Sequence, residues 1–422
     1  MDYRKEYEKW LASGALTAEE HAELEAIRDD DKEIKERFYA PLEFGTAGLR
    51  GTMKVGLHQM NRFVINWATQ GFADVIKEQG AAAMERGVAI CMDCRNHGYE
   101  FAKAAACVMA ANGIKVRLFD ELRPTPELSF AVREYHCIAG INVTASHNPK
   151  EYNGYKVYWE DGAQLPPQHA DQIAKNLEKI DIFTGPKTMD FDEAVKSGMI
   201  TIFGEDCDKR FLEEVMKMVN DYDSVAKVAD TFKVVYTPFH GCGHKLVPEA
   251  LRRLGVKHII CEPEQMKIDG SFPTVASPNP ENPEGFYLAI DLAKKEGANF
   301  IVGTDPDSDR VGVMVQDDKG EFKPVSGNQM GVLLLDYLIG AMKRAGTLPA
   351  DAAMCKSLVT TEMARKVAES NGVACYDTFT GFKFMAVKMG QLEGRFSLFC
   401  LLGRIICLCR LSIYTSLHCS VI

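Results

Sequence analysis

Ser146 lies in a segment whose polar side chains could handle a phosphate group, since the chain around it reads TASHNP. An apolar stretch, Cys137–Val143, precedes this segment and is typical of a strand, whereas Pro149 prevents a helix from starting at once. We therefore expect Ser146 to lie exposed in a turn at the end of a strand. A serine hydroxyl needs a proton acceptor and a nearby positive charge to act as a nucleophile, and His147 and Lys156 could supply them.

Three aspartates at alternate positions follow a second apolar, strand-like run. They are Asp305, Asp307 and Asp309, and the run before them is Asn299–Gly303. In an extended loop alternate side chains point the same way, so these carboxylates should converge on a small volume, where they repel unless a cation binds. All-oxygen ligands favour a hard ion such as Mg²⁺. We expect a magnesium site here rather than a solvated acidic turn.

A calcium-binding EF-hand is the obvious rival interpretation of an aspartate-rich loop. Counted from Asp305, the sixth position is Arg310, where an EF-hand requires glycine. The twelfth position is Gln316, where a bidentate glutamate belongs. The sequence therefore excludes this type of calcium site.

Two glycine-containing segments could bind phosphate groups with backbone amides and a basic side chain. The first reads GTAGLRG and carries Arg50, and the second reads TGFK, with Thr380, Gly381 and Lys383. Glycine lets backbone N–H groups approach a ligand closely, and a guanidinium or ammonium group pairs with phosphate. Each segment alone is weak support, because such turns are common and surface cations are usually solvated.

The four segments together resemble the motifs of the α-D-phosphohexomutase family, the phosphoglucomutases and phosphomannomutases. GTAGLRG, TASHNP with the following NGYK, DPDSDR and TGFK occur in the family's order, and the resemblance covers roughly residues 40–395. The N-terminal YEKWL resembles the longer, phosphoglucomutase-like branch.

The resemblance implies a role for each residue singled out above. The implied catalytic residues are Ser146, His147, Lys156 and Arg50, the substrate-binding residues are Thr380, Gly381, Lys383 and Arg310, and the metal ligands are Ser146, Asp305, Asp307 and Asp309. The implied reaction interconverts glucose 1-phosphate and glucose 6-phosphate through a phosphoserine. Its cofactors would be Mg²⁺ and glucose 1,6-bisphosphate as primer, and mannose or pentose phosphates stay open as substrates.

Two other functions remain alternatives at this point. One is a non-catalytic truncation product that binds sugar phosphates and Mg²⁺ without turnover. The other is a phosphatase with an aspartyl nucleophile, which the pair Asp305 and Asp307 superficially resembles. The phosphatase would leave Ser146 without a role.

Composition indicates an enzyme of the cytoplasm. The net charge of −10 argues against binding to nucleic acid or to an anionic membrane surface. The 13 cysteines form no framework, which suits reduced thiols, and the start MDYRKEYEKW lacks the apolar core of a signal peptide. We expect hexose phosphates as partners, whereas the oligomeric state stays open.

Alternating strand and helix patterns predict an α/β fold of successive mixed units around a central cleft. Strands are expected at 87–92, 115–119, 232–236, 258–261 and 311–316, and helices at 60–79, 99–112, 245–254 and 283–296. The expected segments are a helical extension (1–40), an α/β domain with the serine loop (41–200), one with the metal loop (201–325), an incomplete sugar-binding third domain (326–396) and a divergent tail (397–422). Ligands bind beyond the carboxyl ends of strands in such sheets, so the serine and acidic loops should meet in one cleft.

The apolar tail is unlike the charged, periodic sequence before it. At this point a family member would continue into a glutamate-containing sugar loop and a final domain. We expect a frameshift, a mispredicted exon boundary or a truncated gene, the final domain absent and turnover greatly reduced. A membrane anchor is disfavoured because the apolar run is short and Arg404 interrupts it.

Overall fold

The computed structural model describes residues 1–44, 48–392, 397–402, 405–408 and 420–421. Their contacts divide the chain into two compact units. Unit 1 comprises Met1–Glu121, His136–Glu160 and Gln164–Phe203, and unit 2 comprises Leu122–Tyr135, Asp161–Ala163 and the chain from Gly204 onward. The segment Leu122–Tyr135 thus groups with unit 2, although its neighbours in sequence belong to unit 1.

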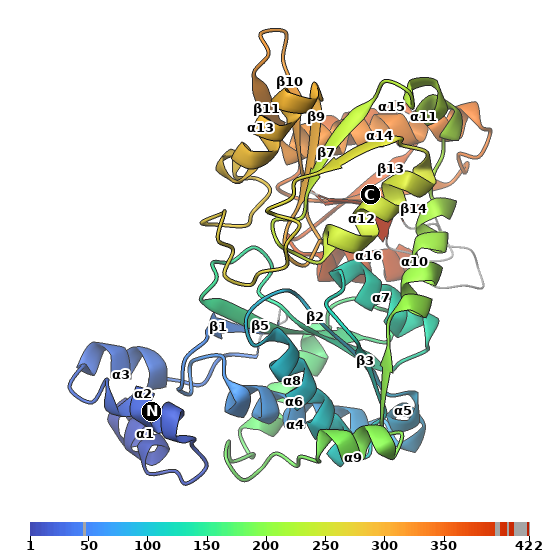
Figure 1. Cartoon of the computed structure of the whole chain (residues 1–422). Coiled ribbons are helices and arrows are strands. Elements are labelled where there is room, and N and C mark those ends of the chain that lie inside the picture. The colour runs from blue at the N-terminus through green and yellow to red at the C-terminus, as the bar shows by residue number, and fades with distance from the viewer. Residues whose placement is uncertain (45–47, 393–396, 403–404, 409–419, 422) are drawn as a thin grey trace. The chain divides into compact units, whose positions relative to one another are not determined.

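Three short helices form the start of unit 1 and gather together (Figure 1). They are α1 (Tyr3–Leu11), α2 (Ala18–Glu25) and α3 (Asp31–Phe38). Thr17 and Glu20 form the capping box that begins α2. Trp10 and Phe38 are fully buried between the helices, with ring centroids 5.7 Å apart in an edge-on contact. Burial of these aromatic rings holds the extension together.

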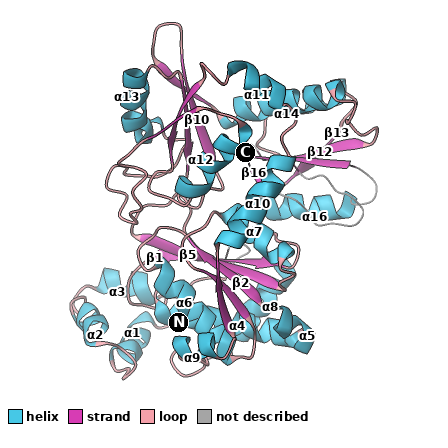
Figure 2. Cartoon of the chain, turned by 45° about the vertical axis from the view of Figure 1, so that its right-hand side comes forward, coloured by secondary structure: helices cyan, strands magenta, loops and turns pink. Residues whose placement is uncertain are grey.

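A six-stranded sheet forms the centre of unit 1 (Figure 2). Its strands are β1 (Leu49–Thr52), β2 (Val88–Met92), β3 (Val116–Phe119), β4 (Ala139–Val143), β5 (Tyr152–Trp159) and β6 (Ile200–Phe203), in the order β1-β5-β4-β2-β3-β6. The helices of the sheet domain are α4 (Arg62–Glu78), α5 (Ala81–Arg86), α6 (Gly98–Ala111), α8 (Pro167–Leu177) and α9 (Phe191–Lys196). Strands β4, β2, β3 and β6 run parallel, and every residue of β2 and β4 is buried. The strand–helix alternation predicted up to Ser146 is confirmed for β2, β3 and β4, whereas β6 was not predicted and β5 pairs antiparallel with both β4 and β1.

Unit 2 contains a second sheet whose order is β11-β10-β9-β7-β8. Its strands are β7 (Lys233–Thr237), β8 (His258–Cys261), β9 (Phe300–Thr304), β10 (Val311–Gln316) and β11 (Phe322–Val325). The accompanying helices are α7 (Thr125–Glu134), α10 (Glu205–Lys217), α11 (Tyr222–Val228), α12 (Gly243–Leu254), the 3₁₀ turn η1 (Pro283–Phe286) and α13 (Tyr287–Glu296). Strands β9 and β10 are antiparallel neighbours, so the acidic segment between them is a connection within one strand pair.

A third sheet completes unit 2, in the order β13-β12-β14-β15-β16. Its strands are β12 (Ala352–Ser357), β13 (Ala374–Thr378), β14 (Ser397–Leu402), β15 (Ile405–Leu408) and β16 (Ser420–Val421), and its helices are α14 (Gly327–Arg344), α15 (Glu362–Ser370) and α16 (Phe382–Leu392). Parallel pairing of β12 with β13 and β14 makes this region an α/β unit, and β14 lies within the segment that was expected to be the divergent tail. Much of the predicted divergent tail, namely residues 403–404, 409–419 and 422, lies outside the described residues.

None of the helices in the described ranges is both long enough and apolar enough to cross a membrane.

Candidate active-site loops

Ser146 sits in a tight turn directly after β4. Its φ of 54° is in the left-handed region, which residues other than glycine rarely adopt. Its amide donates to Oγ1 of Thr144 at 2.8 Å, and Nδ1 of His147 lies 3.2 Å from Oγ of Ser146. Only 3 % of Ser146 is exposed, so the expectation of an exposed serine was wrong. The turn is buried because a side chain of unit 1 binds its backbone carbonyl oxygens.

The side chain of Arg95 provides that internal binding. The side chains of Arg95 and Asp93 are fully buried, with Nε of Arg95 3.3 Å from Oδ2 of Asp93. The carboxylate of Asp93 also accepts hydrogen bonds from the hydroxyl of Thr144 and from the backbone amide of Arg95. The guanidinium donates to the carbonyl oxygens of four residues of the serine loop: Ser146, Asn148, Pro149 and Tyr152. One buried cation therefore fixes the backbone path from Ser146 to the start of β5.

The two predicted basic residues lie on neighbouring strands of the sheet, β1 and β5. Arg50 of β1 lies opposite Gly154 of β5, and its Nη1 donates to Oδ1 of Asn148 at 3.0 Å. Lys156 lies on β5 opposite Asn142 of β4 and is 5 % exposed. A Cβ atom at Gly154 would stand 2.4 Å from the carbonyl oxygen of Thr144, so the close pairing of the strands requires glycine there. Residues 45–47 of the predicted GTAGLRG segment lie outside the described residues.

The three predicted aspartates converge in the connection between β9 and β10. Asp305, Asp307 and Asp309 each offer a carboxylate oxygen, and these oxygens lie within 4.8 Å of one another. Asp305 and Asp307 are fully buried. Burial, followed by the negative charges of Asp307 and Asp309, raises the pKa of Asp305 well above its usual range. Such a set of hard oxygen donors with excess negative charge fits a divalent cation of the Mg²⁺ type.

Backbone contacts hold the acidic loop against the segment that joins β7 to α12. The amide of Cys242 donates to the carbonyl of Pro306 at 2.8 Å. A Cβ atom at Gly241 would lie 2.4 Å from Cα of Pro306, so this approach also requires glycine. Within the loop, the amide of Arg310 donates to Oδ1 of Asp305 at 2.9 Å. Nε of Arg310 lies 3.9 Å from Oδ1 of Asp309. The loop is therefore tied to a second loop of unit 2.

The TGFK segment follows β13 in the third sheet. Gly381 has a φ of 120°, and Lys383 lies in the first turn of α16 with its Nζ 4.8 Å from the ring centroid of Phe384. Thr380 comes directly before this turn, beyond the carboxyl end of β13. Ligands of α/β sheets bind at such ends, so the placement agrees with a binding role. Substrate binding by this segment stays a prediction.

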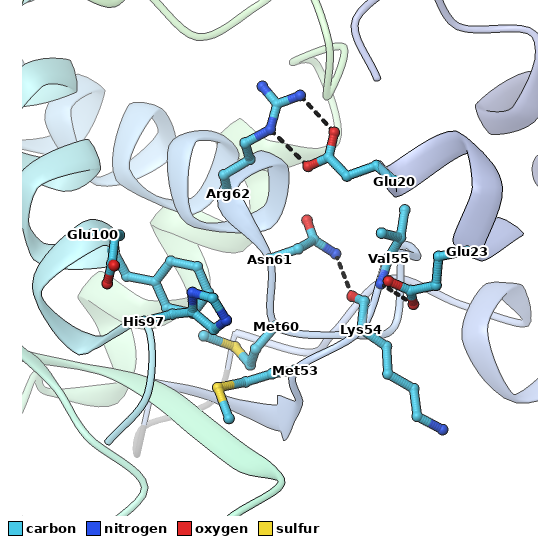
Figure 3. A pocket seen from close by; sticks show the side chains of 11 residues that line it. Glu20, Glu23, Met53, Lys54, Val55, Met60, Asn61, Arg62, His97 and Glu100 are labelled. Atoms are coloured by element: carbon cyan, nitrogen blue, oxygen red, sulfur yellow. Dashed lines mark hydrogen bonds and ion pairs between the residues drawn. The ribbon is translucent and has the colours of Figure 1, made fainter. Parts of the chain in front are cut away.

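A pocket of about 320 Å³ lies in unit 1, beside the N-terminal helices (Figure 3). Arg62 and Glu20 in its wall form an ion pair of 2.7 Å, and the carboxylate of Glu23 accepts the amide of Val55 at 3.0 Å. These contacts fasten α2 to the segment between β1 and α4. The pocket lining contains none of the residues that were predicted to act in catalysis, metal binding or substrate binding. We therefore interpret this region as a structural contact between α2 and the chain before α4.

Sequence reasoning missed the residues that hold the two loops. Asp93 and Arg95 follow the buried strand β2, which is the same placement that marked the aspartate loop. Their position at the end of a buried strand was the signal that could have identified them, because a single arginine has no characteristic spacing. Thr125, whose contact with Asp307 is described below, is remote in sequence from every motif and had no signal of its own.

Three successive segments match the sequence models of a single family. Residues 41–182, 209–320 and 326–401 match the α/β/α domains I, II and III of phosphoglucomutase/phosphomannomutase. The chain belongs to this family. The phosphohexomutase resemblance and the α/β fold class predicted from the motifs are thereby confirmed.

Relatives within the phosphoglucomutase/phosphomannomutase family carry more than one name. The chain is 35 % identical over 356 residues to a phosphoglucomutase of Staphylococcus saprophyticus, covering 84 % of this chain and 62 % of the relative. It is 34 % identical over 409 residues to a human phosphopentomutase, covering 94 % of this chain and 66 % of the relative. The chain therefore spans slightly less than two thirds of the length of these relatives.

The fold of this family member is shared with solved structures. A crystal structure of a phosphoglucomutase/phosphomannomutase family protein from Burkholderia thailandensis superimposes with a TM-score of 0.68 at 19 % identity. The superposition covers 89 % of this chain and 74 % of that one.

Proposed function

We propose that this chain is a phosphosugar mutase in which Ser146 carries the transferred phosphoryl group. The observation that carries the proposal is the serine turn, where a buried hydroxyl has an imidazole nitrogen at 3.2 Å. Arg50 and Lys156 lie on the strands next to this turn and add positive charge for a phosphate. The names of the relatives, phosphoglucomutase and phosphopentomutase, support the same reaction class.

The acidic triad is proposed as the site of the cofactor Mg²⁺. Asp305, Asp307 and Asp309 would hold the ion, and the proposal requires that an oxygen on Ser146 also reach it. When bound, the ion would neutralise charge that develops on the phosphoryl oxygens during transfer. The raised pKa of Asp305 supports this assignment, because a triad without a cation retains strong repulsion.

The chemical step exchanges one phosphorus–oxygen bond for another. A hydroxyl of the sugar monophosphate forms a bond to the phosphorus, and the bond from phosphorus to Oγ of Ser146 breaks. In net terms one proton passes from the sugar hydroxyl to Oγ of Ser146. Oγ of Ser146 regains a proton, for which Nδ1 of His147 is placed at hydrogen-bond distance. Arg50 and Lys156 would balance the phosphate charge throughout. The bisphosphate then turns over and returns its other phosphate to Ser146.

Glucose 1-phosphate and glucose 6-phosphate are the proposed substrate pair, with glucose 1,6-bisphosphate as the primer. Arg310, Thr380, Gly381 and Lys383 would bind the sugar phosphate. The phosphopentomutase among the relatives keeps pentose phosphates as the alternative pair. The cytoplasm is the proposed location, because the 13 cysteines form no disulfide framework and suit a reducing compartment.

A coupled assay tests the proposal. The purified chain receives glucose 1-phosphate, the bisphosphate primer and Mg²⁺, and glucose 6-phosphate is followed through a dehydrogenase; a parallel reaction contains ribose 1-phosphate. We expect turnover that Ser146→Ala abolishes, and the rate also measures the expected reduction of activity. Equal rates for the wild type and Ser146→Ala would refute the phosphoserine mechanism, and an alanine variant that still releases inorganic phosphate would favour the phosphatase.

A further inference from the structure

Thr125, the first residue of α7, makes two hydrogen bonds to a member of the acidic triad. Its hydroxyl donates to Oδ2 of Asp307 at 2.9 Å, and its backbone amide donates to the carbonyl oxygen of Asp307 at 2.8 Å. Both residues are buried, with Thr125 8 % exposed and Asp307 fully enclosed. We propose that Thr125 is a positioning residue for the metal site, fixing the carboxylate of Asp307 for cation binding. This inference rests on the proposed assignment of the triad to a divalent cation.

The local sequence makes Thr125 a rigid donor. Pro124 and Pro126 flank it, and proline fixes φ near −65°, so both neighbours restrict the backbone. As the first residue of a helix, Thr125 has an amide that no helical carbonyl accepts, which leaves it available to Asp307. The two bonds therefore cost little conformational entropy when the loop folds.

The start of α7 is itself anchored by a buried ion pair. Arg123 precedes the helix and is 1 % exposed, and its guanidinium binds both carboxylate oxygens of Asp208 on α10, at 2.6 and 3.3 Å. Lys245 of α12 contacts the same carboxylate at 3.0 Å. Three elements of unit 2 thus meet at Asp208 and hold Thr125 in place.

Asp307 needs such a partner because of its chemistry. The carboxylate plane of an aspartate turns easily about χ2, and the negative charge of Asp309 repels that of Asp307. A hydroxyl donor on one oxygen fixes the plane and offsets part of the repulsion before a cation arrives. Partners that orient metal ligands in this way typically change metal affinity by roughly 10- to 100-fold when removed.

Binding of Mn²⁺ to the full chain, followed by electron paramagnetic resonance of the free ion, tests the inference without relying on activity. Mn²⁺ is the probe because carboxylate sites accept it in place of Mg²⁺. Thr125→Val removes the hydroxyl at nearly constant volume, and Thr125→Ser restores it. Thr69→Val is the matched control, since Thr69 is also fully buried and donates to the carbonyl of Ile65 at 2.7 Å in unit 1.

We expect Thr125→Val to weaken Mn²⁺ binding by roughly tenfold or more, and Thr125→Ser to keep most of the affinity. Thr69→Val should lower the melting temperature yet bind Mn²⁺ like the wild type. Wild-type affinity in Thr125→Val would overturn the inference, as would a serine variant as weak as the valine variant. If the wild type and Asp309→Asn bind Mn²⁺ equally poorly, the proposed metal site itself fails, and the inference fails with it.

Discussion

Replacement of Arg95 by leucine is expected to destabilise unit 1 and to release the serine turn. The substitution keeps apolar bulk but removes every donor that the guanidinium offers to the loop of Ser146. It also leaves the buried carboxylate of Asp93 without its cation. The change therefore separates the role of Arg95 in holding the turn from any direct role in catalysis.

The size of the loss follows from the burial of the groups that are left behind. Breaking a buried ion pair by removing one partner costs about 3–5 kcal/mol. The carbonyl of Ser146, whose residue is 3 % exposed, adds roughly 1–3 kcal/mol as an unsatisfied buried acceptor. Pro149 is exposed, so water can reach its carbonyl and we assign it no cost. Arg95→Leu should thus lose about 4 kcal/mol or more, a large part of the 5–15 kcal/mol typical of a domain.

Urea denaturation followed by tryptophan fluorescence measures this loss. The chain has 3 tryptophans, and all belong to unit 1: Trp10, Trp67 and Trp159. Arg86→Leu is the control, because Arg86 also binds carbonyl oxygens and pairs with Glu160, but both side chains are more than a third exposed. The control should lose about 1 kcal/mol or less. If Arg95→Leu and Arg86→Leu unfold at the same urea concentration, the argument for an internally bound serine turn is wrong.

Two further predictions concern unit 2. Burial, followed by the charge of Asp208, raises the pKa of Glu127 well above its ordinary value. Glu127 therefore stays protonated in the folded chain while an unfolded glutamate ionises above about pH 4.5, so stability falls as the pH rises. Glu127→Gln should remove this loss, so above pH 4.5 its stability relative to the wild type should rise by roughly 1.4 kcal/mol per pH unit. Thermal melting at several pH values measures this difference. Wild-type and variant melting temperatures that change in parallel with pH would contradict the raised pKa. Gly241→Ala should push on Pro306, cost about 1–3 kcal/mol and weaken Mn²⁺ binding, whereas Gly14→Ala, with open space around it, should be neutral in both measurements.

Strands bounded by clear turn signals were predictable from the sequence. The runs at 258–261 and 311–316 coincide with β8 and β10, and the expected helix at 99–112 differs from α6 by one residue at each end. Short runs rich in apolar and β-branched residues between turn residues identify such strands even where burial is partial, as in β8, which has no fully buried residue. The capping box at Thr17 likewise needs only residues close together in sequence.

Elements that depend on tertiary contacts were not predictable in the same way. The NGYK segment is part of β5, although Asn153 and Gly154 read as turn residues. Gly154 belongs in the strand because two neighbouring backbones approach it too closely for a side chain. Helix α7 begins between Pro124 and Pro126, where no element was expected, and its packing within unit 2 lies outside any local pattern.

In the candidate site, too, local patterns were predictable and long-range contacts were not. The convergence of the three carboxylates was predicted correctly, but from an extended loop that does not form. The segment is a turn, in which the amide of Ser308 donates to the carbonyl of Asp305 at 2.9 Å and Ser308 has a φ of 53°. The supports of the site, Arg95 and Thr125, act over long distances in sequence and leave no periodic signal. The burial of Ser146 was missed for this reason, since Arg95 determines the path of its loop.

Transfer of phosphate from glucose 1,6-bisphosphate to the chain is the most direct test of the proposed mechanism. The chain is incubated with the bisphosphate and Mg²⁺, digested, and the peptide that contains Ser146 is analysed by mass spectrometry. We predict one added phosphate group on Ser146, lost in Ser146→Ala and strongly reduced when Mg²⁺ is chelated or Asp307 is replaced by asparagine. Phosphate on another residue, or equal labelling of Ser146 with and without the aspartate triad, would contradict the joint action of the serine turn and the acidic loop.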